Sequence, residues 1–426
     1  MPAPEPVPQS ENRFGPLVAV IALCFIGVGL ALQPFGSLVD GLARINISTT
    51  GLISDFFALG GLGAALANCG LVLLLELTFC RVLGISVRGP IMASMLMTAG
   101  FAFFGTNPVN ALPLMAGVAL YAKLAHKSQQ DTATAALLCT ALGPLVSFLA
   151  FGTVWFPLAG LLAGTTAGLL SGLVFVPLAA HFFQLNKGYS IYNAGFTAGM
   201  LALLWVSILR FAGLQVEGVS VIYGGADGAL WALAIALCVL LIAYGLIISR
   251  GRLSGMMTLL RDSGKLPADF VNRHGRGAAL FNMGITGLVA LGYVAVVDAP
   301  MTGPVLGGVL GVISFAAYGK HPLNCLPVML GCALMQWVCG VDMQGSGALI
   351  AVLYGTTLAP MAGEFGPVAG LFVGALHAAV VVNVFPVNGG INLYNNGFSG
   401  GLIAAAVVPI AEALRQKSGH RRDTAR

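Results

Sequence analysis

The chain has 426 residues, of which 58% are hydrophobic and only 8% are charged, and its formal net charge is +5. A soluble globular domain carries about 25% charged residues, so this chain has too few to cover a water-facing surface. The composition therefore predicts a polytopic membrane protein. It excludes a cytosolic enzyme, a nucleic-acid-binding protein and a secreted disulfide-rich scaffold.

The chain begins with a polar, acidic segment, 1–14, which we interpret as a disordered cytoplasmic tail. From residue 15 onward, apolar runs of about 20 residues follow one another, and a helix of that length crosses about 30 Å of hydrocarbon. Ten runs are long enough to span a membrane: 16–36, 57–80, 133–152, 157–181, 191–211, 229–249, 277–297, 346–361, 366–386 and 394–412.

Two further stretches, 89–124 and 303–338, each contain two shorter apolar arms separated by Gly, Pro and Asn residues. An arm of about 15 residues gives roughly 22 Å of helix, which is short for a full crossing. We therefore predict that each stretch forms a re-entrant hairpin that returns to the side it left.

The basic residues gather on one side under this topology. With the N-terminus in the cytoplasm, 17 of the 20 Lys and Arg residues fall inside, and the exceptions are Arg44, Arg210 and Lys320. Because cytoplasmic loops are enriched in Lys and Arg, this distribution predicts a bacterial inner-membrane protein with both termini in the cytoplasm.

Comparison of the chain with itself shows an internal repeat. The segment Gly63–Gly70 recurs as Gly277–Gly284, and the same shift relates 89–90 to 303–304 and 104–113 to 318–327. After a shortened loop, the Tyr-Asn-x-Gly-Phe sequence at 192–196 recurs at 394–398. Because three blocks share one ungapped shift, we interpret the repeat as a duplication.

Each half of the chain holds five spans and one hairpin. Because five is odd, the second copy enters from the opposite face, and the two copies are inverted. The predicted fold is therefore an all-α polytopic membrane protein with two inverted repeats of five transmembrane helices plus one re-entrant hairpin each. Its parts are repeat 1 at 15–213, an external linker at 214–228, repeat 2 at 229–412 and a basic cytoplasmic tail at 413–426.

The breaks in the two hairpins are candidates for the lining of a permeation path. Irregular backbone is tolerated at membrane depth only where it is buried in protein or lines a wet cavity. The amides at the breaks can bind a solute or cap the freed backbone groups, and the sequence leaves both interpretations open. The candidate residues at the breaks are Asn107, Asn110, Lys320, His321 and Asn324.

A second set of candidates lies on or at the start of predicted spans. Tyr192 with Asn193, and Tyr394 with Asn395, open one helix in each half, where free N–H groups form a partial positive end suited to an anionic or carbonyl oxygen. Capping alone would also explain these Asn residues. Asn68 and Asn282 lie inside spans, where an amide bonds to a neighbouring helix or to a solute.

Two charges have no counterpart in the other repeat. Lys320 corresponds to Thr106, and it favours an anionic solute unless it is exposed at the outer mouth of its hairpin. Glu76 corresponds to Ala290, and it can reach the membrane interface, meet Arg81 or carry a coupling proton.

The duplicated Asn-Pro-x-Asn element at 107–110 and the duplicated Tyr-Asn element resemble the urea transporter family. The resemblance implies two inverted five-helix repeats, each with a tilted re-entrant helix, and a homo-oligomer with one pore per protomer. In the second copy His321 replaces the first Asn. The chain also resembles, more closely, an uncharacterised group of duplicated bacterial membrane proteins.

We expect a channel-like facilitator that passes a small polar solute, urea- or amide-like, with selectivity set by pore diameter and the few amide groups. The alternative is an ion-coupled secondary transporter of a small anion, with Lys320 as its charge partner. We expect neither cofactor nor metal nor enzymatic activity, because the chain has no nucleotide-binding loop and no HExxH motif. The expected partners are the solute, the lipid bilayer and further copies of the chain in a dimer or trimer.

Overall fold

The computed structural model describes residues 14–153 and 156–423, without the side chains from residue 416 onward. The predicted polar tail therefore lies outside the described residues except for Phe14, as do most side chains of the basic tail.

Ten helices in the described part are long and apolar enough to cross a membrane, and each overlaps one predicted span. The protein is thus an all-α polytopic membrane protein. The ten helices are α1 (Gly15–Leu32), α4 (Leu62–Val82), α7 with α8 (Gln129–Phe151), α9 (Pro157–Asn186), α10 (Asn193–Phe211), α11 (Gly228–Ile248), α14 (Arg276–Val296), α17 with α18 (Ser346–Phe365), α19 (Pro367–Val387) and α20 (Asn395–Asp423).

The two predicted hairpins are also present. In repeat 1, α5 (Gly89–Phe101) is followed by α6 (Pro108–Leu124), and in repeat 2, α15 (Gly303–Phe315) is followed by α16 (Pro322–Val338). Each arm carries Pro in its first turn, where the missing N–H costs nothing. The remaining short helices are α2 (Phe35–Ile47), α3 (Phe56–Gly60), α12 (Ser254–Leu259) and α13 (Phe270–His274).

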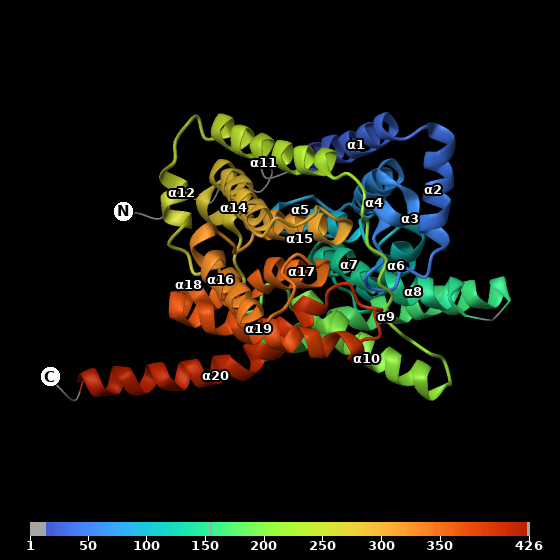
Figure 1. Cartoon of the computed structure of the whole chain (residues 1–426). Helices are drawn as coiled ribbons and strands as arrows, with labels where there is room; N and C mark the ends of the chain where they lie inside the picture. Colours follow the sequence, from blue (N-terminus) through green and yellow to red (C-terminus); the bar gives the residue numbers. More distant parts are fainter. Residues whose placement is uncertain (1–13, 154–155, 424–426) are drawn as a thin grey trace.

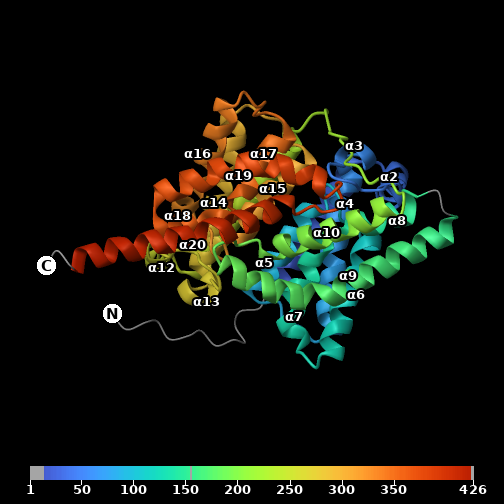
Figure 2. The ribbon, with the colours of Figure 1, turned by 90° about the horizontal axis from the view of Figure 1, so that it is seen from below.

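The two repeats are built alike and point in opposite directions. Helix α1 packs on α4 as α11 packs on α14, and α6 packs on α9 as α16 packs on α19. In Figure 1, α20 runs toward one side of the molecule and α10 toward the other. In Figure 2 the α6–α7 turn and the equivalent α16–α17 turn lie at opposite edges. We call the face with α12 and α13 the basic face, and the face with the linker between α10 and α11 the linker face.

Glycines let the repeats meet at the centre. A Cβ atom on Gly195 would lie 2.8 Å from the Cα atom of Gly397, and one on Gly397 would lie 2.8 Å from the Cα atom of Gly195. Gly100 of α5 and Gly307 of α15 approach one another in the same reciprocal way. Gly195 and Gly397 are equivalent residues of the two repeats, so their contact marks a pseudo-twofold axis between the starts of α10 and α20. The equivalent helices α5 and α15 also pack on one another.

One span in each repeat is interrupted near this axis. A short 3₁₀ turn, Cys139–Leu142, separates α7 (Gln129–Leu138) from α8 (Gly143–Phe151). In repeat 2 the turn Thr356–Leu358 separates α17 (Ser346–Gly355) from α18 (Ala359–Phe365). Such a mid-helix 3₁₀ stretch frees backbone groups from the helical ladder.

The non-helical segments that precede α10 and α20 form backbone hydrogen bonds to these interruptions. Each segment bonds to the interruption in the other repeat. The Ile191 N–H donates to the Thr357 carbonyl at 2.9 Å, and the Leu393 N–H donates to the Ala141 carbonyl at 2.9 Å. The repeats are therefore joined through irregular backbone near the axis, where unpaired polar groups would be most costly.

Candidate functional site

The amide of Asn110 closes the break in the first hairpin. Its Nδ2 donates to the Gly105 carbonyl at 2.8 Å and to Ser147 Oγ at 3.0 Å, and its Oδ1 accepts from the Asn107 N–H at 3.0 Å. The Nδ2 of Asn107 in turn donates to the Ile45 carbonyl at 3.2 Å. Both amides are buried, and their polar groups are bonded to the chain rather than presented to a solute.

The second hairpin repeats this arrangement. The Nδ2 of Asn324 donates to the Gly319 carbonyl at 2.9 Å, and its Oδ1 accepts from the His321 N–H at 2.9 Å. His321 Nε2 lies 2.9 Å from the Asp262 carbonyl oxygen and holds the hairpin tip to the basic-face loop. The geometry is that of capping, the second of the two interpretations left open by the sequence.

The amides of Asn68 and Asn282 join each hairpin to the preceding span. Both are fully buried, as interhelical bonding requires. Asn68 donates to the carbonyls of Ala102 and Thr106 at 2.8 and 3.0 Å, and Asn282 donates to those of Ala316 and Lys320 at 2.8 and 2.7 Å.

Lys320 lies in the interior of the protein, so the alternative that it is exposed at an outer mouth is wrong. Its side chain is fully buried. Its Nζ donates to the Tyr192 hydroxyl and to the Gly311 carbonyl, the latter at 3.3 Å, and lies 4.2 Å from the centre of the Tyr192 ring. Among the described residues no carboxylate forms an ion pair with it. The axis therefore holds the amino group of Lys320, and its hydrogen-bond partners among the described residues are neutral.

Aromatic rings fill the axis beside Lys320. The ring centres of Tyr192 and Tyr394 are 4.7 Å apart, and Tyr354 lies 6.0 and 6.3 Å from them. Phe315 packs on Tyr192 at 4.9 Å, and Phe101 packs on Tyr394 at 5.0 Å. We call these five residues the aromatic cluster. All are buried, and the hydroxyls of Tyr354 and Tyr394 have no hydrogen-bond partner.

The interrupted spans contain a duplicated motif that was not predicted from the sequence. Thr140-Ala-Leu-Gly-Pro144 in repeat 1 is matched by Thr356-Thr-Leu-Ala-Pro360 in repeat 2. In each copy the proline occupies the first turn of the second helix segment. This duplicated Thr-x-Leu-small-Pro pattern is the signal that would have located the interruptions.

A cavity of about 450 Å³ leads from the linker face toward the axis. Its mouth is formed by the loops around Leu52, Val219 and Val341, and its wall by α16, α17 and α19. It reaches Asn395 and Asn396 at the start of α20. Of the residues predicted to contact a solute, Asn395 is the one that lines this cavity.

Asn395 has a buried donor without a described partner. Its side chain is 2% exposed, its Oδ1 accepts from Asn388 Nδ2 at 2.5 Å, and its Nδ2 has no partner among the described residues. In repeat 1 the equivalent Asn193 accepts from Asn186 at 2.9 Å, but its Nδ2 donates to the Ala179 carbonyl at 2.9 Å. In both copies the amide oxygen accepts a hydrogen bond from the earlier asparagine. The amide nitrogen is bonded in repeat 1 and has no described partner in repeat 2.

His377 joins α19 to α20 behind this cavity. Its Nε2 lies 3.1 Å from Asn396 Oδ1, and its Nδ1 lies 3.3 Å from Ser399 Oγ. Ser399 stands at the centre of a Gly-x-Ser-x-Gly sequence, 397–401, as in many serine hydrolases. Here, however, it lies within a helix, is fully buried and contacts the Asn396 carbonyl at 3.1 Å, which is a packing arrangement.

Glu76 is also buried in the interior, so the interpretation that it reaches the membrane interface is wrong. Its carboxyl lies near Thr98, but the Thr98 hydroxyl donates to the Met95 carbonyl at 2.9 Å. Among the residues that the structure describes, neither carboxyl oxygen has a hydrogen-bond partner.

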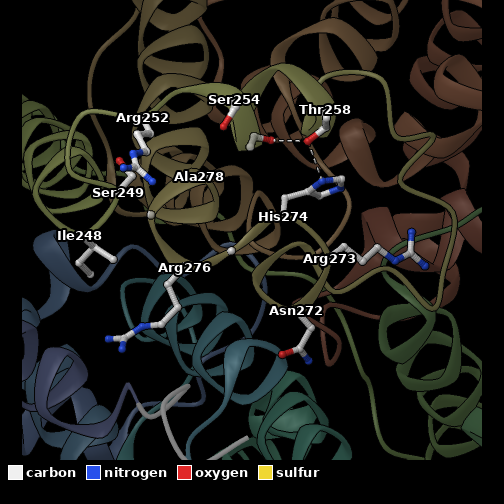
Figure 3. A pocket seen from close by; sticks show the side chains of 13 residues that line it. Ile248, Ser249, Arg252, Ser254, Thr258, Asn272, Arg273, His274, Arg276 and Ala278 are labelled. Atoms are coloured by element: carbon white, nitrogen blue, oxygen red, sulfur yellow. Dashed lines mark hydrogen bonds between the residues drawn. The ribbon is translucent and has the colours of Figure 1, made fainter. Parts of the chain in front are cut away.

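A second cleft, of about 470 Å³, opens on the basic face between α12 and the start of α14. His274 bridges Thr258 and Asp262 there, and Arg273 pairs with Asp262 at 3.1 Å. Burial disfavours ionisation of Asp262, but the bonds from His274, the Gly264 N–H and Arg273 outweigh it and hold its pKa well below the usual range. Figure 3 shows the labelled basic side chains spread around the cleft rather than converging on one point.

A buried aspartate links the repeats at the linker face. Asp55 caps α3 through the Phe57 N–H at 2.9 Å and also accepts from the Gly303 and Tyr223 N–H groups at 3.0 and 3.1 Å. Burial raises its pKa to about 6, against the effect of these donors. Its repeat 2 equivalent, Asp269, caps α13 through the Asn272 N–H at 3.1 Å. The two aspartates are related by the same shift as the other repeated segments, and this was the available sequence signal.

The comparison with known proteins divides the chain at the same place as the duplication. Two segments of the chain, 36–211 and 248–413, match the model of one family, and each segment falls in one half of the chain. No curated protein and no solved structure matches the chain. The expected likeness to an uncharacterised duplicated family is confirmed, whereas no link to urea transporters is found. Because the two segments cover well over half of its length, the chain belongs to the family described as "Protein of unknown function (DUF1576)".

Proposed function

We propose that the protein passes a small polar solute across the membrane along the interface between its two repeats. The observation that carries this proposal is the cavity that starts at the linker face and ends at Asn395, beside the pseudo-twofold axis. Transporters with inverted repeats hold their solutes where broken helices of the two repeats meet, because free backbone groups and helix ends are available there.

The aromatic cluster is the barrier on this path. Tyr394 directly precedes Asn395, and Tyr354 lies one helical turn beyond the cavity residues Ile350 and Ala351. Since all the rings of the cluster are buried, a solute that enters from the linker face must displace them before it reaches the basic face.

Lys320 favours a neutral or an anionic solute. Its buried amino group has no described carboxylate partner, and when protonated it repels cations from the axis, as positive charge does in other selective pores. The leading candidate is therefore a channel-like facilitator for a neutral polar solute, in agreement with the resemblance to urea transporters. The second candidate is an ion-coupled transporter of a small anion that pairs with Lys320.

The proposed setting is a bacterial inner membrane with the basic face in the cytoplasm. The clustering of Lys and Arg in the loops of that face supports this orientation. A homo-oligomer, a dimer or trimer, is part of the same proposal, because the resemblance implies one pore per protomer.

Flux through reconstituted protein tests the proposal. Liposomes containing the purified chain are exposed to gradients of small neutral and anionic solutes, and their volume change is followed by light scattering. We expect faster equilibration of at least one solute than in protein-free liposomes. Rates that are the same with and without protein for every solute contradict the proposal. Dependence of uptake on a proton or sodium gradient would identify the coupled transporter.

Cysteine labelling links the flux to the cavity. In a Cys24→Ser, Cys339→Ser background, A348C places a thiol on the cavity wall, and Q344C places one on the same face outside the cavity. We expect a charged methanethiosulfonate reagent to reduce the flux of A348C at least tenfold relative to its own unlabelled rate. The Q344C flux should not change. Equal responses of the two variants would remove the cavity from the path.

A further inference from the structure

Two residues that line the cavity, Asn395 and Gln336, each have one buried polar atom without a partner among the described residues, one a donor and the other an acceptor. The donor is Nδ2 of Asn395, and the acceptor is Oε1 of Gln336, whose side chain is 4% exposed. A buried polar group without a partner is unfavourable, so an occupant that satisfies both atoms is favoured.

Both amides are held in fixed orientations. Asn388 Nδ2 donates to Asn395 Oδ1 at 2.5 Å, which leaves the Asn395 nitrogen free. Gln336 Nε2 donates to the Ala348 carbonyl at 3.0 Å, which leaves the Gln336 oxygen free. A matching ligand therefore presents an acceptor oxygen to Asn395 and an N–H or O–H group to Gln336.

The rest of the cavity is aliphatic and uncharged. None of the residues that line it carries a charge, so a charged ligand would lose its hydration without compensation. The wall includes Ile350, Ala351, Val381 and Phe385, which offer contact to an apolar group. A volume of about 450 Å³ lies within the usual range for small-molecule sites.

We infer that this cavity is a binding site for a small, neutral, amphipathic molecule with one head group that both donates and accepts hydrogen bonds and a short aliphatic body. A branched aliphatic carboxamide meets this description, whereas urea lacks the aliphatic body and a carboxylate lacks the neutral head. The inference rests on the proposed function in treating this molecule as the solute, but binding itself is measured without transport.

Protection of a cavity thiol measures binding directly. The A348C variant in lipid vesicles is labelled with a methanethiosulfonate reagent in the presence of isobutyramide, urea or isobutyrate. We expect isobutyramide to slow labelling at concentrations where the other two have no effect. Equal or better protection by urea or isobutyrate overturns the inference.

Leucine variants test the two polar atoms. N395L and Q336L should each raise the isobutyramide concentration needed for half protection by about tenfold, as expected for the loss of one hydrogen bond. The matched control is N383L, an exposed asparagine of α19 that bonds only within its own helix. Unchanged protection in N395L and Q336L contradicts the inference.

Two outcomes separate this inference from the proposed function. If isobutyramide protects the thiol but no solute crosses the membrane, the binding site stands and transport fails. If the thiol reacts in detergent but not in lipid vesicles, an acyl chain fills the cavity and the binding inference fails, whatever the flux experiments give.

Discussion

Asn193 and Asn395 occupy the same place in two copies of one fold, and the contrast between them shows what duplication preserves and what it leaves free. Both side chains accept a hydrogen bond from an asparagine seven residues earlier. In repeat 1 the Nδ2 of Asn193 also donates a hydrogen bond to the Ala179 carbonyl. In repeat 2 the residue at the position of Ala179 is Val381, which lines the cavity, and the nitrogen has no partner.

A few substitutions on the common frame account for this contrast. Gln336 stands where repeat 1 has Ala122, and His377 stands where it has Phe175. Each change adds polar groups to the repeat 2 side of the axis. The repeated backbone therefore provides a symmetric framework, and the unrepeated side chains decide which polar groups each half leaves unpaired.

The largest effect is expected from substitutions on the pseudo-twofold axis. G195V or G397V introduces a side chain whose Cβ atom lies 2.8 Å from the Cα atom of the facing glycine. We expect either substitution to lower the free energy of unfolding by about 3 kcal/mol or more, since the facing backbone must move. Thermal unfolding in detergent measures the loss. G27V, at an exposed position in α1 with no atom nearby, serves as the control. A stable G195V beside an unstable G397V would show that the axis is not symmetric.

The next effect compares the two capping aspartates. D55A removes an acceptor of three N–H groups, two of them from other elements, whereas D269A removes a local cap. We expect D55A to destabilise the protein by about 2 kcal/mol more than D269A, because buried donors are left without partners. The shift in thermal midpoint of the two variants gives the difference. Equal midpoints would mean that the links from Asp55 to repeat 2 and to the linker contribute little.

The hairpin tips offer a contrast in charge. K320M replaces the buried amino group by an apolar side chain of similar length, and T106V is the control at the equivalent tip. We expect K320M to keep or raise the free energy of unfolding, by about 1 kcal/mol, because a buried amino group without a counter-ion no longer has to be desolvated. We also expect potassium leakage from K320M liposomes and none from T106V liposomes. A strongly destabilised K320M that excludes potassium would contradict the role of Lys320 in charge selection.

The smallest effect concerns two surface ion pairs. Lys187 and Glu412, 2.5 Å apart, join repeat 1 to α20, whereas Arg415 and Glu364, 2.7 Å apart, join the end of α20 to α18 of repeat 2. We expect K187A and R415A each to change the free energy of unfolding by less than about 1 kcal/mol, because exposed pairs are screened by water and salt. Chemical denaturation at two salt concentrations measures both. A loss in K187A several times that in R415A would show that the repeats depend on this link.

Much of the fold is predictable from the sequence because hydrophobic length and internal repetition are strong signals. They give the ten spans, both hairpins and the duplication. The interruptions at Cys139–Leu142 and Thr356–Leu358 were not predicted, because they lie inside continuous apolar runs. In the sequence, a proline in the first turn of a helix cannot be told from a proline within a helix.

The candidate site is less predictable. The sequence identifies Asn110 and Asn324 as polar groups at breaks, but whether an amide bonds a carbonyl or a solute depends on how tightly the tip folds. The cavity at Asn395 arises from differences between two spans that are far apart in the sequence, so no local sequence pattern predicts it. Asp55 recurs in the sequence as Asp269, but its role as a bridge appears only once Gly303 and Tyr223 are placed beside it.

The bonds from Ile191 to Thr357 and from Leu393 to Ala141 have a consequence for biosynthesis. A chain that leaves the ribosome from its N-terminus inserts Ala141 into the bilayer long before Leu393, its partner near the other end, is made. Until that segment arrives, the Ala141 carbonyl lacks this partner at depth in the bilayer. A gene cut between the halves should therefore give stable protein only when both pieces are produced in the same cell at the same time.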